Sequence, residues 1–209
     1  YGRVFNDGFY GRIAFDREGK RLVFVADDGR DPRTRAETEN DFEIIRPDQG
    51  EGYTGYGPAQ VWIAHLAADP THHAAEQIER LTDDSDWYGD PQWTPDGKSI
   101  VVHANRSNDR ESVRYSINKN YDIWSIDAAT KAIRQLTDGP GPEVSARISP
   151  DGKRLVCLSV PRKGSHRDVF NLAVVDLGVK PSTRVLFDHH GTDPPPHPIP
   201  YFPLPPNCW

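Results

Sequence analysis

Three residues in the C-terminal part of the chain have the side-chain types that nucleophilic catalysis needs. Ser165, His166 and Asp168 could supply a nucleophile, a base and an orienting acid. A triad is defined by its arrangement in space, however, and near neighbours in sequence do not indicate one. The Gly-x-Ser-x-Gly turn that presents a nucleophilic serine is absent, and so are glycine-rich phosphate-binding motifs. The sequence therefore predicts no catalytic residue in this chain.

Histidine pairs could suggest a metal site. His72 and His73 are adjacent, as are His189 and His190, and His197 follows the second pair. Adjacent residues of a strand point to opposite faces, and these pairs lack the usual spacing of metal ligands. We expect neither a metal nor another cofactor.

Acidic residues gather in a strongly charged stretch over residues 27–40, which we expect to be flexible or locally helical. Glu37, Glu39 and Glu43 could bind the ammonium group of a substrate, but a solvated charged loop is the interpretation we favour.

Two segments have the composition of a binding surface. Residues 50–58 are dense in Gly, which permits close backbone approach, and in Tyr, which offers a flat ring with a hydroxyl. The alternative for this segment is a solvated loop packed on the neighbouring blade. The second segment is Asp86-Trp87-Tyr88, and its Trp could equally well line a pocket or cover the interface between blades. The predicted substrate-binding residues are Glu51, Tyr53, Tyr56, Asp86, Trp87 and Tyr88.

A repeated turn positions these segments. Residues 93–98 recur at 148–153 and, in degraded form, at 15–20, each time between two apolar runs. Pro presets the backbone of such a turn, Asp tolerates the next position, and Gly takes the left-handed conformation that closes a hairpin. The structural turn residues are Gly19, Pro95, Asp96, Gly97, Pro150, Asp151 and Gly152.

The repeat extends beyond the hairpin. Two further β-rich runs follow each copy, so each unit contains four strands in up-and-down order, and the excess length lies in loops. Four-stranded repeats of about 40 to 50 residues are typical of β-propeller blades. We predict an all-β partial propeller over residues 1–209, with blades at 9–82, 83–137 and 138–188 and the start of a fourth at 189–209. A β-sandwich with two similar hairpins is the alternative.

The composition limits the partners. The net charge is −6 with both signs interspersed, which argues against a nucleic-acid surface, and no apolar run is long enough to span a membrane. Propellers close with about four to eight blades, and the chain contains no Met. We therefore expect an internal piece of a longer protein, poorly soluble or oligomeric when expressed alone.

The long connections should share one face. In an antiparallel blade, the loops between second and third strands lie on the same side as the loops between blades. The insertions at 27–59, 107–120 and 161–170 and the connections at 83–89 and 139–143 therefore lie opposite the tight turns, on the side where we expect binding.

The repeats resemble those of a known family. Residues 92–100, followed by Tyr121-Asp122-Ile123-Trp124 and Arg134-Gln135-Leu136-Thr137, are similar to the TolB-type propeller repeat, which TolB shares with the propellers of prolyl oligopeptidase-family serine peptidases. The insertion at 51–62 is more similar to dipeptidyl-peptidase and acylaminoacyl-peptidase propellers. The resemblance implies a C-terminal α/β-hydrolase domain that supplies the catalytic Ser, Asp and His, and a peptide substrate that the propeller filters.

Three functions remain open from the sequence. The first is a non-catalytic propeller segment that gates and binds peptides for a hydrolase domain absent from this chain. The second is a TolB-like module that binds protein partners in a bacterial envelope. The third is a metal-dependent polysaccharide lyase propeller, which would need several His residues at its axis. The sequence does not choose between the bacterial cytoplasm and an exported location.

Overall fold

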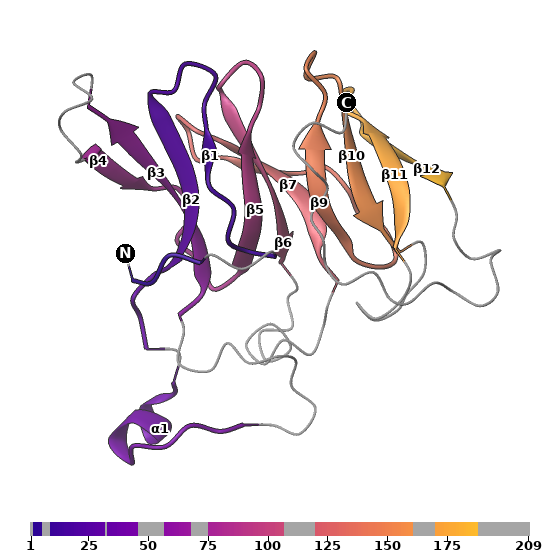
Figure 1. Cartoon of the computed structure of the whole chain (residues 1–209). Coiled ribbons are helices and arrows are strands. Elements are labelled where there is room, and N and C mark those ends of the chain that lie inside the picture. Colours follow the sequence, from indigo (N-terminus) through magenta and orange to yellow (C-terminus); the bar gives the residue numbers. More distant parts are fainter. Residues whose placement is uncertain are drawn as a thin grey trace.

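A computed structural model describes residues 2–5, 9–31, 33–45, 57–67, 75–106, 120–160 and 170–187. These residues form three four-stranded antiparallel sheets in which each strand pairs with the next along the chain (Figure 1). This confirms the predicted all-β propeller architecture with three blades. The expected start of a fourth blade, 189–209, lies outside the described residues.

The strand bounds are as follows. The first sheet contains β1 (Ala14–Phe15), β2 (Arg21–Asp27), β3 (Ala59–Leu66) and β4 (Ala75–Arg80). The second contains β5 (Trp87–Trp93), β6 (Ser99–Asn105), β7 (Asp122–Asp127) and β8 (Ile133–Gln135). The third contains β9 (Glu143–Ile148), β10 (Arg154–Ser159), β11 (Asn171–Asp176) and β12 (Ser182–Phe187).

The repeated hairpins form the predicted turns. Gly19, Gly97 and Gly152 have φ angles of 69°, 66° and 70°, in the left-handed region that glycine adopts most easily. The backbone N–H of Gly97 donates to the Thr94 carbonyl at 2.8 Å, and that of Gly152 to the Ser149 carbonyl at 2.9 Å. These turns are therefore set by short-range backbone chemistry.

The turn aspartates complete these hairpins. The Asp96 carboxylate accepts from the Thr94 hydroxyl at 2.6 Å and from the Lys98 N–H at 3.1 Å. Asp151 accepts from the Ser149 hydroxyl at 2.6 Å and from the Lys153 N–H at 3.0 Å. Pro95 and Pro150 precede these aspartates, where a ring-fixed φ suits the turn.

The core lies between neighbouring sheets. Ile100 and Val102 of β6 join a cluster with Val61 and Ile63 of the first sheet. Val101, between them in sequence, joins a second cluster with residues of the third sheet, including Cys157. A strand that is buried on both faces explains why β6 is almost continuously apolar.

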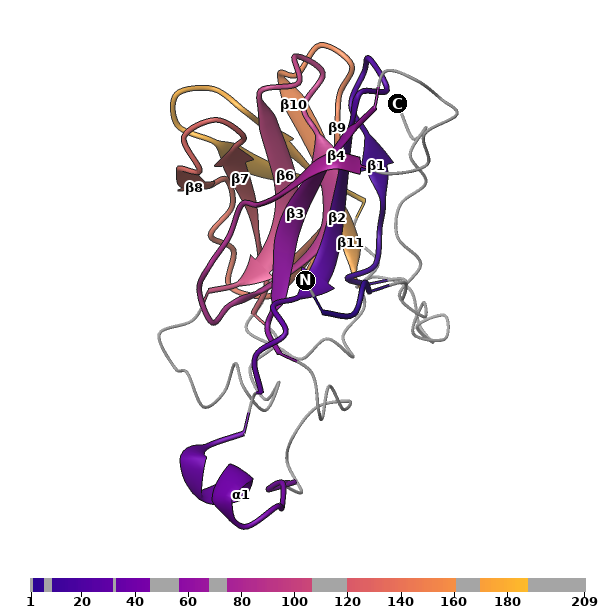
Figure 2. The same ribbon diagram turned by 90° about the vertical axis from the view of Figure 1, so that its left-hand side faces the viewer.

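Contacts between strands show which edges of the three sheets lie at the centre and which lie outside. β1 contacts β5 and β5 contacts β9, so the first strands of the three sheets converge, whereas β4, β8 and β12 form the opposite edges. The sheets fan out from this inner edge, as Figures 1 and 2 show.

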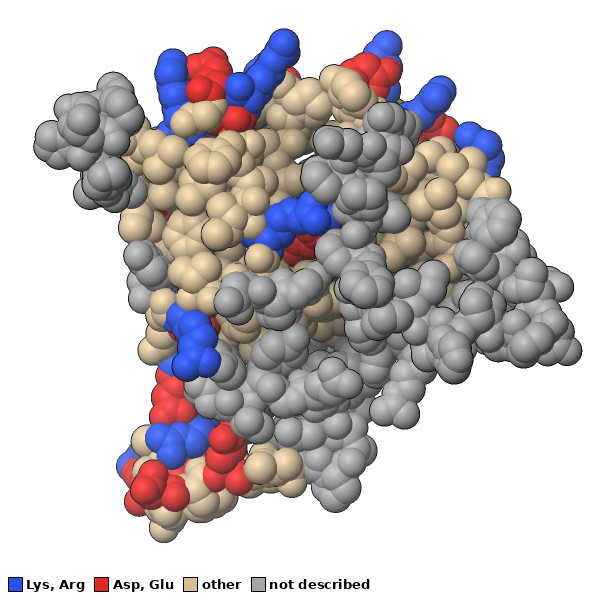
Figure 3. All heavy atoms as spheres, in the orientation of Figure 1, with Lys and Arg blue, Asp and Glu red and all other residues tan. Residues whose placement is uncertain are grey.

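The two ends of the strands differ. The hairpin turns lie at one end, where Figure 3 shows Lys and Arg side chains beside Asp and Glu. The single helix of the described residues, α1 (Arg35–Glu39), lies in the β2–β3 connection and projects from the other end (Figure 1). No helix in the described part of the chain is long and apolar enough to cross a membrane.

We predict that Gly97→Val lowers the free energy of unfolding by about 1–2 kcal/mol, because a β-branched residue is strained at positive φ. A Cβ at this position would also lie 3.0 Å from Nη2 of Arg21. Lys98→Ala is the control, since its exposed side chain should contribute less than about 0.5 kcal/mol. Equal midpoints of the two variants in urea would refute the role of this turn.

Candidate functional site

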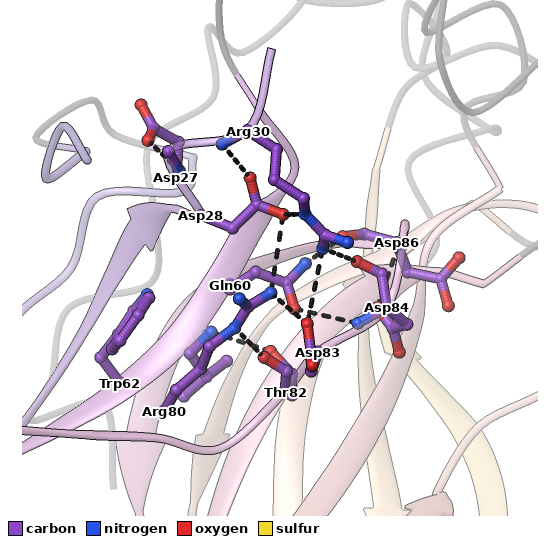
Figure 4. A network of polar contacts seen from close by, with 12 residues as sticks. Asp27, Asp28, Arg30, Gln60, Trp62, Arg80, Thr82, Asp83, Asp84 and Asp86 are labelled. Carbon is purple, nitrogen blue, oxygen red and sulfur yellow. Dashed lines mark hydrogen bonds and ion pairs between the residues drawn. The ribbon is translucent and has the colours of Figure 1, made fainter. Parts of the chain in front are cut away.

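We call the end of the strands from which α1 projects (Figure 1) the insertion face. A network of charged side chains lies at this face, beside the junction of the first and second sheets (Figure 4). The Asp28 side chain is completely buried and its carboxylate pairs with the guanidinium groups of Arg30 and Arg80, the latter at 3.5 Å. Asp83 pairs with the same two arginines, at 3.5 Å and 2.8 Å. The network therefore ties the β2–β3 connection to the end of β4.

A second part of the network begins at β5. The Tyr88 hydroxyl donates to Asp84 at 2.6 Å, and Arg106 pairs with Asp84 at 2.8 Å and with Asp86 at 3.4 Å. The Arg106 guanidinium also lies 5.1 Å from the Trp124 ring centroid, within cation–π range. Burial and the Asp84 carboxylate raise the pKa of Tyr88, so its hydroxyl remains a hydrogen-bond donor.

Gln60 of β3 links the first sheet to the connection that leads into the second sheet. Its side-chain amide donates to the Asp86 carbonyl at 2.9 Å and accepts from the Asp84 N–H at 3.4 Å (Figure 4). The connection between the first two blades is thus held by an amide from β3.

The predicted binding residues divide into two groups. Glu51, Tyr53 and Tyr56 lie outside the described residues. Asp86, Trp87 and Tyr88 are described and are buried, with exposed fractions of 1%, 8% and 0%.

Trp87 packs within the protein. Its ring centroid lies 6.0 Å from that of Phe5 and 5.6 Å from that of Tyr10. We considered a pocket wall and a packed interface for this ring, and the contacts that the structure describes are those of a packed interface. β5 begins at Trp87, so the connection expected over 83–89 is shorter than predicted.

The acidic residues of the insertion have different roles. The α1 segment is locally helical, as expected, but Glu37 is fully buried rather than solvated. Its carboxylate accepts from the Thr34 N–H at 2.7 Å and from the Ile44 N–H at 2.9 Å. Glu39 pairs with Arg35 at 2.6 Å on the exposed side of the helix. Glu37 is therefore a structural capping residue, because its oxygens are bound within the insertion.

A cluster of acids occupies the junction of the second and third sheets. Burial, followed by the charges of Glu143 and Asp138, raises the pKa of Asp122 to about 7. Burial also raises the pKa of Glu143, although the Gly139 N–H donates to it at 3.2 Å. In the described part of the chain, no group of three His, Cys, Asp or Glu residues has a geometry that could hold a metal ion.

A buried histidine, His103 of β6, lies next to the inner edge, where it pairs with Gly89 of β5. His103 is 1% exposed, and neither ring nitrogen has a hydrogen-bond partner among the described residues. Its ring packs on Phe9 at 4.4 Å and on Tyr121 at 5.7 Å between centroids. Burial, assisted by the charge of Arg147, lowers the pKa of His103 to about 3. A neutral imidazole is therefore part of this aromatic core.

A buried ion cluster joins all three sheets near this histidine. Asp90 of β5 pairs with Nε of Arg12 at 2.9 Å and with Nη1 of Arg147 at 2.7 Å. Arg12 precedes β1 and Arg147 belongs to β9, so each blade supplies one member. This cluster joins the inner edges of the sheets.

The described networks consist of paired charged side chains, and the residues first considered for catalysis are not among the described residues. Ser165, His166 and Asp168, and the paired histidines at 72–73 and 189–190, are outside the described residues. What the described polar groups offer is a rigid wall of paired carboxylates and guanidinium groups.

Sequence reasoning missed the arginines of these networks and Gln60. One signal was present, because Leu-Thr-Asp follows the fourth strand of two blades. The Thr82 hydroxyl accepts from the Val61 N–H at 3.0 Å, and the Thr137 hydroxyl accepts from the Ile123 N–H at 2.8 Å. The repeated Thr therefore indicates a hydrogen bond that fixes the end of the blade, and Asp83, which follows the first of these Thr residues, belongs to the charged network.

Comparison with known proteins relates these blades to two groups. No protein-family model matches the chain. Dipeptidyl-peptidase 5 of Porphyromonas gingivalis is 31% identical over 109 residues, which is 50% of this chain and 16% of that protein. Dipeptidyl-peptidase 5 of Porphyromonas endodontalis is 27% identical over 172 residues, which is 76% of this chain and 24% of that protein. The chain thus spans a quarter or less of the length of these relatives.

Solved structures share the fold. TolB from Acinetobacter baumannii matches with a TM-score of 0.53 at 18% identity, over 87% of this chain and 33% of that one. A puromycin-hydrolyzing peptidase from Mycobacterium tuberculosis matches with a TM-score of 0.51 at 15% identity, over 85% of this chain and 22% of that one. The resemblance to TolB-type and peptidase propellers is confirmed.

We predict that Asp122→Asn stabilises the protein at pH 8 by about 1–2 kcal/mol and has little effect near pH 4. The folded-state pKa of about 7 lies above the usual 3.8, so the folded state is penalised once the carboxyl ionises, and the penalty disappears as the pH falls. Asp127→Asn is a control of opposite sign, because hydrogen bonds from Thr130 and Ala129 lower the pKa of Asp127. A gain from Asp122→Asn that is equal at both pH values would contradict the assignment.

We also predict that His103→Leu reduces acid destabilisation. The folded-state pKa of about 3 lies below the usual 6.5, so wild-type stability from this group is complete above pH 6.5 and falls as the pH approaches 3. As the pH falls from 6.5 to 3, the free energy of unfolding of His103→Leu should rise relative to that of the wild type by about 1 kcal/mol per pH unit. His65→Leu, at a half-exposed position, is the control in the same urea titrations. Parallel pH profiles for wild type and His103→Leu would argue against a buried neutral histidine.

Proposed function

We propose that the chain is a non-catalytic propeller segment of a prolyl oligopeptidase-like serine peptidase. It gates access and binds peptide substrate for an α/β-hydrolase domain elsewhere in the parent protein. The observation that supports this most is the similarity to dipeptidyl-peptidase 5, which extends over 76% of the chain. The blade fold, shared with a puromycin-hydrolyzing peptidase, agrees with it.

The insertion face is the surface that we propose for peptide contact. In the described network of Figure 4 and its continuation at Arg106, four carboxylates, those of Asp28, Asp83, Asp84 and Asp86, pair with three guanidinium groups, those of Arg30, Arg80 and Arg106. The Asp83 side chain is 77% exposed and is available to a substrate cation such as a peptide ammonium group.

Within this proposal the six predicted residues have two tasks. Asp86, Trp87 and Tyr88 are buried and position the wall of the site. Glu51, Tyr53 and Tyr56 contact the peptide, since their insertion joins the network at Gln60 of β3. Loops mounted on a rigid scaffold are the usual place for such contacts.

A second candidate function is a TolB-like protein-interaction module. It is favoured by the match to TolB, whose TM-score of 0.53 is similar to that of the peptidase. The two functions differ in what the parent protein contains: a hydrolase domain with a reactive serine, or none.

The parent protein distinguishes them directly. We expect the full-length protein to react with a fluorophosphonate serine probe, and to cleave short peptides, as a hydrolase domain with an activated serine would. Full-length protein that neither reacts with the probe nor cleaves a peptide library would exclude the peptidase proposal and favour the interaction module.

We predict that the double substitution Tyr53→Ala and Tyr56→Ala in the full-length protein raises KM for peptides about 3- to 10-fold with little change in kcat. Loss of binding that is equal in ground and transition states has this signature. Lys98→Ala is the matched control, because its hairpin lies on the opposite face. A KM within error of wild type for the double variant would rule out a peptide contact by these two rings.

A further inference from the structure

The first sheet has a row of apolar side chains on the face that points away from the second sheet. The residues of this row lie directly opposite one another across β1 to β4, and they are Phe15, Leu22, Ala64 and Ile78. Val23 and Ile63 alternate with the row along β2 and β3, and their side chains belong to the core shared with the second sheet. The row therefore faces outward, and Phe15 and Ile78 are 62% and 40% exposed.

The corresponding rows of the other two sheets pack against the sheet that precedes them. In the second sheet the row is Trp93, Ile100, Ile126 and Ile133, and in the third it is Ile148, Leu155, Val175 and Thr183. The second row packs with Val61 of the first sheet, and the apolar members of the third row pack with Val101 of the second. Phe15 and Trp93 each lie four residues before a turn glycine, yet Trp93 is only 7% exposed. The exposed row of the first sheet is therefore the surface with which a blade of this repeat packs on the blade before it.

An arginine completes the interface between the first and second sheets. The Arg21 guanidinium lies 4.1 Å from the Trp93 ring centroid, and its Nη2 donates to the Gly97 carbonyl at 2.8 Å. Nε of the same side chain donates to Asp16 at 2.8 Å, which holds the guanidinium in place. The turn of the second blade is therefore bound by a cation of the first blade, through a cation–π contact and a hydrogen bond at once.

The arginine and the aromatic ring occur together in this repeat. Ser99 has the position of Arg21 in the second blade, two residues after the turn glycine, and the third blade has Ile148 in place of Trp93. An aromatic ring in one blade is thus matched by arginine in the blade before it, and an aliphatic side chain is matched by serine. Because Phe15 is aromatic, we expect an arginine in the blade that packs on the first sheet.

We propose that the row from Phe15 to Ile78 is the docking surface for a further four-stranded blade of the parent protein, whose arginine lies over the Phe15 ring and donates to the Gly19 carbonyl. Apolar side chains exposed in this way mark a surface that a partner covers. The chain spans a quarter or less of the length of its dipeptidyl-peptidase 5 relatives, which leaves those proteins length for further blades. The inference rests on the place of the chain in a longer propeller protein, which is part of the proposed function, but it does not rest on peptidase activity.

The test places a photo-crosslinker on this row in the full-length parent protein. Phe15 is replaced by the photoreactive amino acid p-benzoylphenylalanine, and the peptides joined on irradiation are identified by mass spectrometry. We expect the main crosslink to reach another four-stranded repeat of the same protein molecule, next to an arginine at the position that Arg21 has in the first blade. The same replacement at Trp93 is the positive control, because it must crosslink to β2 beside Arg21. Replacement at Val179, which is fully exposed, is the negative control and should give no defined crosslink.

Three results would overturn the docking proposal. The first is a crosslink from position 15 to a hydrolase domain, and the second is a crosslink to a second copy, recognised by its mass in a mixture of ¹⁵N-labelled and unlabelled protein. The third is no defined crosslink from position 15 in a protein whose Trp93 control reaches β2. A crosslink to another blade that lacks the arginine would refute the expected cation. A parent protein that gives the expected crosslink but does not react with a fluorophosphonate probe would refute the peptidase proposal and leave this one intact.

Discussion

The apolar faces of each four-stranded sheet can be buried only against a neighbouring sheet, and the rest of the structure follows from this constraint. β6 satisfies it on both sides, with Ile100 and Val102 facing the first sheet and Val101 facing the third. Charged groups are then confined to strand ends and edges. Asp90 joins the three sheets at the inner edge, and Asp84 joins the first two at the insertion face. The same packing that stabilises the blades therefore fixes where polar chemistry is possible.

The hairpins and the sites differ in how far the sequence could predict them. Gly97 and Asp96 interact with residues within a few positions, so the turn can be recognised from the sequence alone. The partners of Asp90 lie in two other blades, and no local pattern indicates them. Glu37 was expected in a solvated loop because its burial depends on Ile44 folding back over a single helical turn. The fold was predictable from its repeat, whereas the sites depend on contacts between repeats.

The two ends of the blades have different physical characters, and this bears on function. At the hairpin end, side chains such as Asp151 bond mainly within their own turn, and exposed ion pairs there contribute little. At the other end, Arg106 and Gln60 connect different strands and connections into one rigid wall. Rigid walls beside long connections are suited to binding, because little ordering is needed when a ligand arrives. This supports peptide contact at the insertion face.

Hydrogen exchange of the full-length protein tests this assignment most directly. Amide exchange would be measured by mass spectrometry with and without a peptide that the protein binds but does not cleave. We expect protection in residues 27–59 and 83–89 and none in the hairpins at 15–20, 93–98 and 148–153. Protection of the hairpins, with unchanged exchange in the insertion and the blade connection, would contradict the proposed binding face.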